Sequence, residues 1–152
     1  MELKNFGQLK KEELEQIIDI HYNYWCKFNP SMIRENTENK FKNLYTLNQI
    51  PIGIALFDKN NLVVFCVIKK ENLKKYPQFF PWISDLMIFE EYRNKGYGTY
   101  LVKNIVKMLK NKGFEKVYVW TDQAPNFYKK LGFKFLQKIE KNEGGEGELY
   151  VI

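Results

Sequence analysis

Histidine, cysteine and long apolar runs are what this sequence of 152 residues has least of. Its single histidine is His21, and its two cysteines, Cys26 and Cys66, lie far apart among aromatic or aliphatic residues. A metal centre needs several such ligands in one place, so we expect no metal site. We expect two buried thiols instead of a disulfide, and we expect His21 to be a packed core histidine and not a catalyst.

The apolar runs are too short to cross a bilayer. The first residues, Met1 to Lys4, contain no apolar core of the kind that a secretion signal carries. Together these two observations predict a cytoplasmic protein that has no membrane partner.

Positive charge exceeds negative charge, with 24 lysine and arginine residues against 18 aspartate and glutamate residues and a formal net charge of +6. The lysines are spread along the whole chain instead of gathering in one segment. Nucleic-acid binding would favour a basic face interleaved with aromatic residues, and that alternative stays open at this stage. We expect a solvated basic surface, part of which attracts a phosphate-rich ligand, and no nucleic-acid partner.

The length suits one domain, so we treat residues 1–152 as a single domain. Apolar periodicity and turn residues predict strands over 1–6, 52–57, 62–68, 82–88, 116–121, 133–139 and 148–152, and helices over 10–25, 37–47, 99–112 and the segment after Asp122. Residues 58–61 are expected to form a hairpin turn, and Gly113 and Gly132 to end helices. This pattern predicts a mixed α/β fold with one twisted sheet that carries helices on its faces.

The segment 82–112 contains a strand, a polar loop with two glycines and an amphipathic helix. The first amides of a helix have no partner inside the helix, and the helix dipole adds positive charge there. Gly96 and Gly98 allow the backbone to approach a ligand closely, and Arg93 and Lys95 add full charges. This arrangement predicts an anion site of the size of a pyrophosphate.

The run Arg93-Asn94-Lys95-Gly96-Tyr97-Gly98 resembles the Arg/Gln-x-x-Gly-x-Gly/Ala signature of the GNAT family of N-acetyltransferases. A second segment, Tyr128-Lys129-Lys130-Leu131-Gly132-Phe133, is similar to the Tyr-x-x-Leu-Gly-Phe segment of the same family. The two matches together are far more specific than either alone, and the resemblance extends from about Ile52 to the last residue. It implies a twisted, mostly antiparallel central sheet flanked by helices on both faces.

The resemblance also implies a reaction, the transfer of an acetyl group from acetyl-CoA to an amine. The pyrophosphate of the cofactor would lie over the glycine loop, and its pantetheine arm would bond the backbone of strand 82–88 like an added strand. The implied cofactor-binding residues are Leu86, Met87, Ile88, Arg93, Asn94, Lys95, Gly96, Tyr97, Gly98, Thr99 and Asn126. A backbone amide at Met87 or Ile88 would stabilise the oxyanion.

Tyr128 matches the tyrosine that, in the family, protonates the leaving thiolate, and packing of the short helix is its alternative role. The amine must lose a proton, and Asp85 is the first candidate base, with hydrogen bonding to local amides as an equal alternative. Asp122 is the second candidate, although we expect it to cap the helix after it. Glu35 and Glu71 are weaker candidates, and the implied acceptor contacts are Phe28, Met32, Arg34 and Glu35.

The sequence departs from the family pattern at Trp120, where some members carry a catalytic glutamate, and no asparagine clearly matches the one that contacts the cofactor. An N-acetyltransferase with a primary amine as acceptor, either a small molecule or a peptide, is the leading hypothesis. A non-catalytic acyl-CoA-binding sensor is the alternative, favoured by Trp120 and disfavoured by Tyr128. The oligomeric state is expected to be either a monomer or a homodimer.

Overall fold

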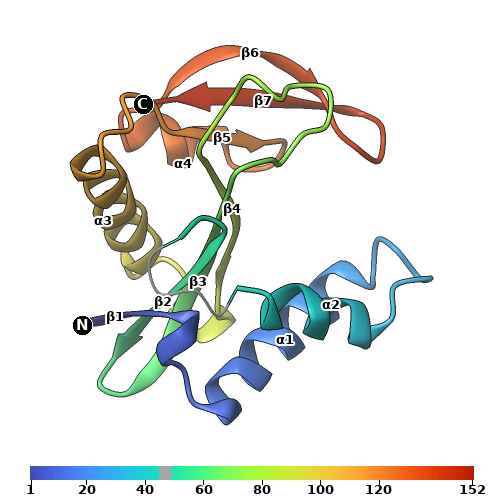
Figure 1. Ribbon diagram of the computed structural model, residues 1–152, viewed down its shortest axis with the longest axis vertical. Helices are drawn as coiled ribbons and strands as arrows, with labels where there is room; N and C mark the ends of the chain where they lie inside the picture. Colours follow the sequence, from blue (N-terminus) through green and yellow to red (C-terminus); the bar gives the residue numbers. More distant parts are fainter. Residues whose placement is uncertain (45–48) are drawn as a thin grey trace. The chain divides into compact units, whose positions relative to one another are not determined.

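A computed structural model describes residues 1–44 and 49–152 of the chain. The chain divides into two compact units, Met1–Val67 with Asp85–Gly98 and Ile68–Ser84 with Thr99–Ile152. Strands β3 (Asn61–Lys69) and β4 (Trp82–Ile88) contribute residues to both units. The strands have the order β1-β2-β3-β4-β5-β7-β6 (Figure 1). The prediction of a mixed α/β fold with a mostly antiparallel, helix-flanked sheet is confirmed.

The first unit contains the N-terminal strands. β1 (Glu2–Asn5) pairs antiparallel with β2 (Ile52–Asp58), and β2 is joined to β3 by a tight turn. Lys59 and Asn60 both have positive φ, of 47° and 68°, as a two-residue hairpin turn of the primed type requires. The predicted hairpin is therefore confirmed. A short 3-10 turn, η1 (Phe6–Gln8), leads from β1 toward the first helix.

Two helices complete the core of the first unit, α1 (Lys11–Trp25) and α2 (Arg34–Lys42), which pack against each other. The predicted apolar stripe of α1 is confirmed only in part, because Leu14, Ile17, Ile18 and His21 are buried whereas Trp25 is exposed. The prediction of a helix over 37–47 was wrong at its start, because α2 begins at Arg34, and wrong at its end, because α2 ends at Lys42. The Arg34–Glu38 ion pair, one helical turn apart, stabilises the earlier start. Residues 45–47 of that prediction lie outside the described residues.

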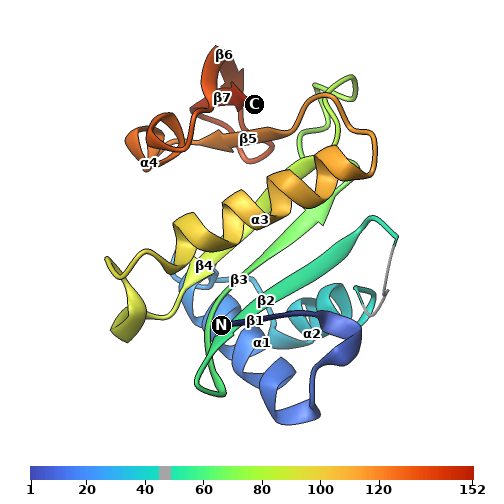
Figure 2. The ribbon, with the colours of Figure 1, turned by 90° about the vertical axis from the view of Figure 1, so that its left-hand side faces the viewer.

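The second unit contains the C-terminal strands. β5 (Tyr118–Thr121) pairs in parallel with β4 at Trp82 and antiparallel with β7 (Glu146–Val151), which pairs antiparallel with β6 (Lys134–Glu140). Helix α4 (Pro125–Lys130) packs against β6 (Figure 2). The core of the second unit includes Trp82, Tyr118 and Leu149.

Helix α3 (Tyr97–Asn111) begins two residues before the predicted start. Its apolar face is buried through Leu101, Val102, Ile105 and Leu109. Gly113 ends it as predicted, with a φ of +92° and an amide that donates to the carbonyl of Lys110 at 3.0 Å. None of the helices in residues 1–44 and 49–152 combines the length and the apolar character that a bilayer crossing demands.

The cysteines only partly match the prediction. Both are free, and Cys66 is fully buried in β3, where burial raises the pKa of its thiol. Cys26 is only half-buried, so the prediction of a second buried thiol was wrong. It stands at the C-terminal end of α1, where the helix leaves the core.

Candidate functional site

The loop that leads into α3 has the backbone geometry of an anion site. It follows a 3-10 turn, η2 (Glu90–Tyr92), and ends where α3 begins. Asn94 and Gly96 have φ angles of +59° and +83°, so the chain turns sharply twice. Left-handed turns of this kind gather backbone amides into a concave surface that suits an anion. The start of α3 adds the positive end of a helix dipole to the same loop.

The side chains of the loop leave this surface open. Arg93, Lys95 and Gly96 are exposed, and a Cβ placed at Gly96 would meet no described atom within 4 Å. Gly98 is buried and Thr99 is half-buried in the first turn of α3. The loop can therefore receive a phosphate group against its backbone, with two cationic side chains beside it.

Tyr97 connects the loop to the end of β2. Its hydroxyl donates a hydrogen bond of 2.5 Å to Oδ2 of Asp58, and this bond raises the pKa of Tyr97. The ring of Tyr92 packs edge-on against that of Tyr97, with centroids 6.0 Å apart, and Nζ of Lys95 lies 5.6 Å from the Tyr92 centroid. Tyr97 thus ties the glycine loop to the hairpin of the first unit, and Tyr92 and Lys95 pack beside it.

We expect Tyr97→Phe to weaken binding of a phosphate-bearing ligand by about three- to ten-fold, because the loop loses its hydrogen bond to Asp58. Titration calorimetry with coenzyme A measures this, with Tyr100→Phe on the next turn of α3 as control. The hydrogen bond needs a protonated phenol. Because the pKa of Tyr97 is raised, the bond is fully formed below pH ~10 and is lost only at higher pH. Equal affinities for wild type and Tyr97→Phe at pH 7 would contradict this role.

Asp85 lies in β4 with an unusual backbone and two charged neighbours. Its φ is +50°, in the left-handed region that a non-glycine residue rarely adopts inside a strand. Oδ2 lies 3.0 Å from Nζ of Lys40, and Oδ1 lies 3.5 Å from Nε2 of His21. The side chain of Asp85 is only 9% exposed. These two charged partners come from α1 and α2, and hydrogen bonding of Asp85 to local amides stays an alternative.

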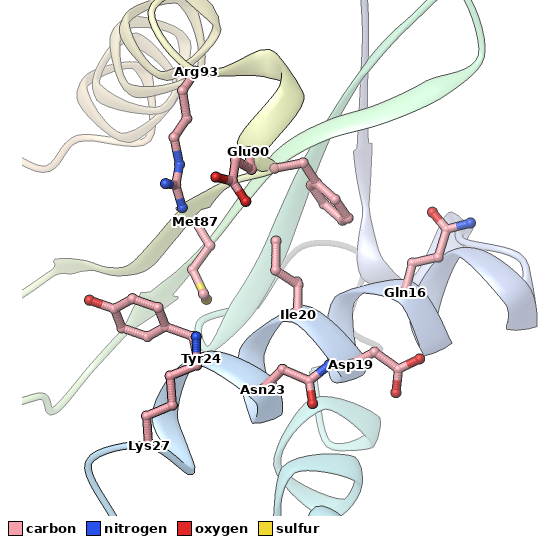
Figure 3. A pocket seen from close by; sticks show the side chains of 10 residues that line it. Gln16, Asp19, Ile20, Asn23, Tyr24, Lys27, Met87, Glu90 and Arg93 are labelled. Atoms are coloured by element: carbon pink, nitrogen blue, oxygen red, sulfur yellow. The ribbon is translucent and has the colours of Figure 1, made fainter.

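A groove opens beside β4 in the first unit, with a volume of about 460 Å³. The lining residues are Gln16, Asp19, Ile20, Asn23, Tyr24 and Lys27 of α1, Met87 of β4, and Phe89, Glu90 and Arg93. Figure 3 shows Met87, Glu90 and Arg93 on one side, and Ile20 and Tyr24 facing them from α1. The floor is apolar, while the rim carries two carboxylates and two cations. A small amphipathic molecule fits such a groove.

The remaining predicted catalytic residue, Tyr128, belongs to the second unit. It is 8% exposed in α4, where its ring packs edge-on against Phe127 and Phe133 with centroids 5.0 and 5.6 Å away. Asn126, on the same helix, is exposed. Both residues thus stand on α4, and Thr99 is in the same unit, whereas all the other predicted cofactor-binding residues belong to the first unit.

The capping prediction for Asp122 was wrong. The amides of Gln123 and Ala124 donate to Oγ1 of Thr121, at 3.3 and 2.9 Å, so Thr121 organises the start of α4. The Asp122 carboxylate instead pairs with Nζ of Lys141 at 2.8 Å. A threonine at the end of a strand serves as well as an aspartate here, because its hydroxyl accepts hydrogen bonds from the following amides.

The predicted acceptor contacts have separate environments. Arg34 is engaged by three carboxylates, Glu15, Asp19 and Glu38, and the first two of these raise its pKa. Phe28 is 65% exposed beside Tyr24, whereas Met32 is half-buried and Glu35 is exposed. None of these four residues is among the residues that line the groove. Of the weaker base candidates, Glu71 is exposed in the second unit.

Two residues that sequence reasoning did not assign to the site lie directly against Asp85, namely His21 and Lys40. His21 is 4% exposed and packs edge-on against Phe41, with ring centroids 4.8 Å apart. The signal for His21 was present, because it is the only polar residue on the apolar stripe of α1. Lys40 gave no such signal among 24 basic residues.

The comparisons with known proteins agree with this fold. A model of the acetyltransferase (GNAT) family matches residues 14–133. N-alpha-acetyltransferase 30 of Schizosaccharomyces pombe is 27% identical over 99 residues, which are 62% of this chain and 66% of that protein. The uncharacterized N-acetyltransferase CgeE of Bacillus subtilis is 37% identical over 60 residues. That match covers 38% of this chain and only 23% of the Bacillus protein.

Among solved structures, an aminoglycoside 6'-N-acetyltransferase complexed with coenzyme A superposes with a TM-score of 0.77. It is 17% identical, and the match covers 100% of this chain and 96% of the other. At this identity the likeness concerns the fold alone. The family model spans most of the chain, including both the glycine loop and the Tyr128 segment, and on this ground the chain belongs to the GNAT acetyltransferase family.

Proposed function

We propose that the protein is an N-acetyltransferase that moves an acetyl group from acetyl-CoA to a primary amine. The observation that carries this proposal is the open glycine loop between Arg93 and Thr99, built at the start of α3 in a chain of this family. Two relatives are named N-acetyltransferases, and solved structures of similar fold hold coenzyme A or acetyl-CoA. These similarities support the proposal independently of the geometry of the loop.

The cofactor would be held mostly by backbone groups. The pyrophosphate lies on the amides of residues 94–99, and Arg93 and Lys95 balance its charge. The pantetheine amides would bond the backbone of Leu86, Met87 and Ile88, and Asn126 would be a further cofactor contact. A backbone amide at Met87 or Ile88 donates a hydrogen bond to the thioester oxygen, which becomes negatively charged as the amine adds.

The reaction proceeds by direct attack of the amine on the thioester carbonyl. A C–N bond forms, the C–S bond breaks, and the thiolate takes a proton from Tyr128, which regains one from water after the products leave. Burial of the Tyr128 phenol supports this role, because the reference pKa values of a phenol and a thiol, ~10 and ~8.5, lie close enough that the proton transfer is not steeply uphill in a dry site. The proton that the acceptor ammonium loses goes to Asp85. Its place in β4, beside residues 86–88, supports that assignment.

The acceptor would lie in the groove between α1 and β4. Met87 lies on its floor, and this strand also carries Asp85. The names of relatives refer to amines of several kinds, among them an α-amine, the ε-amine of thialysine and an aminoglycoside amine, and this range supports a primary amine as the common feature. We further propose that residues 1–152 work as one acetyltransferase domain, since the family match includes parts of both units.

Thiol release from acetyl-CoA against a panel of amines tests the proposal. The panel contains polyamines, aminoglycosides, amino acids, and peptides with a free α-amine or a lysine. We expect release with one class at a rate well above hydrolysis, together with acetyl-CoA binding by calorimetry. Binding without release for any amine would favour the acyl-CoA sensor, and neither binding nor release would refute the proposal.

A further inference from the structure

A compact polar cluster surrounds Asp85 inside the first unit. Two groups lie against its carboxylate, His21 of α1 and Lys40 of α2, and its charge also acts on the thiol of Cys66 in β3. Nζ of Lys40 also lies 3.3 Å from Nε2 of His21, so the three polar side chains touch in a triangle. Their side chains are 4%, 9% and 34% exposed for His21, Asp85 and Lys40. Such burial of several ionisable groups is costly unless they compensate one another.

The backbone conformation of Asp85 is also unusual. Asp85 is a non-glycine residue with φ of +50° in the middle of β4, and a conformation of this kind costs free energy that the surrounding contacts must offset. Strained residues of this type cluster at functional sites. The contacts of Asp85 with α1 and α2 hold it in place, so the carboxylate is positioned from two helices at once.

The ionisable neighbours of Asp85, namely Lys40, His21 and Cys66, differ in their chemistry. The Lys40 ammonium, 3.0 Å away, stabilises the Asp85 anion, which makes Asp85 a poor place for a proton to stay. The imidazole of His21 is next to Oδ1, and an imidazole titrates near pH ~6.5 in its ordinary state. Burial, and then the charge of Asp85, raise the pKa of the Cys66 thiol, which therefore stays neutral and takes no part.

We propose that His21, Asp85 and Lys40 form a proton relay, in which Asp85 takes the proton of the acceptor ammonium and passes it to His21 while Lys40 keeps the carboxylate ionised. The inference rests on the proposed acetyl transfer, because it assigns Asp85 the role of base. The proton lost by the amine resides on Nε2 of His21 during the transfer and returns to water after the product leaves. His21 and Lys40 are positioning residues, since they act through Asp85.

The charge of Lys40 is tested by the pH dependence of kcat/KM. In Lys40→Met the anion loses its stabilising ammonium, so the acidic limb of the profile should move to higher pH by about one unit or more. Lys40→Arg keeps the charge and should restore the wild-type limb. Lys42→Met, two residues further along α2 and paired with half-buried Glu38, is the matched control and should leave the profile unchanged. An unmoved limb in Lys40→Met overturns the role of Lys40.

The proton capacity of His21 is tested by His21→Gln. The amide nitrogen of glutamine reaches about the position of Nε2, so the contact with Asp85 is kept while the group can no longer take up a proton. We expect kcat to fall by about ten-fold or more, with KM for acetyl-CoA unchanged and the fold intact by circular dichroism. Wild-type kcat in a folded His21→Gln protein would overturn the relay. If this variant does not fold, the comparison of Lys40→Met with Lys40→Arg still tests the relay.

Failure of the relay and failure of the proposed function give different results. If Asp85→Asn lowers kcat but the Lys40→Met and His21→Gln proteins behave as wild type, Asp85 is the base and the relay is wrong. If Asp85→Asn leaves both rate and pH profile unchanged, the assignment of the base itself is wrong. If wild type binds acetyl-CoA but transfers nothing, the enzyme proposal fails first, and the relay with it.

Discussion

Replacement of Gly96 by glutamate is expected to weaken acetyl-CoA binding by about a hundred-fold or more. The side chain would put a carboxylate on the surface that receives the pyrophosphate, where like charges within a few ångströms repel strongly. It would also force a Cβ into a backbone with φ of +83°. Calorimetric titration with acetyl-CoA measures the loss, and the variant should fold because a Cβ at Gly96 meets no described atom within 4 Å.

Two controls separate charge from strain at Gly96. Gly96→Ala carries the strain without the charge and should lose far less affinity. Gly144→Glu adds the same charge at a glycine with φ of +88° and equally open surroundings, in the turn between β6 and β7. It should bind acetyl-CoA as wild type does. Unchanged affinity in Gly96→Glu would remove the assignment of this loop to the pyrophosphate.

Tyr128→Phe is expected to lower kcat by about a hundred-fold while KM for acetyl-CoA changes little. Removal of one hydroxyl deletes the proton donor for the thiolate, and general acid catalysis typically contributes about 10²–10⁴-fold. The ring contacts with Phe127 and Phe133 stay, since phenylalanine keeps the same ring. Steady-state rates at several acetyl-CoA concentrations give the split between kcat and KM.

Tyr150→Phe is the matched control for Tyr128→Phe in the same unit. Tyr150 is also buried, and burial and its hydrogen bond to Glu148 raise its pKa to about 12. Loss of that hydroxyl should lower the free energy of unfolding without lowering kcat. If Tyr128→Phe turned over at the wild-type rate, another group or water would have to protonate the thiolate, and Tyr128 would be a packing residue.

Much of the fold was predictable, because its signals are local. The hairpin at Lys59 and Asn60, the helix stop at Gly113 and the apolar stripe of α1 each depend on residues a few positions apart. The glycine loop is of the same kind, since its turns and the start of α3 are encoded in one short run. Errors arose where a local choice had two good answers, as with Thr121 and Asp122 at the start of α4.

The sequence by itself therefore determined the family, the order of helices and strands, and the residues of the glycine loop. Only the tertiary structure decided that Tyr97 bonds Asp58, 39 residues away, and that His21 and Lys40 surround Asp85. The physical reason is that backbone turns and periodicity follow from neighbouring residues, whereas contacts between charged side chains depend on how separate elements pack. A lysine-rich chain offers many partners for one aspartate, and packing selects Lys40.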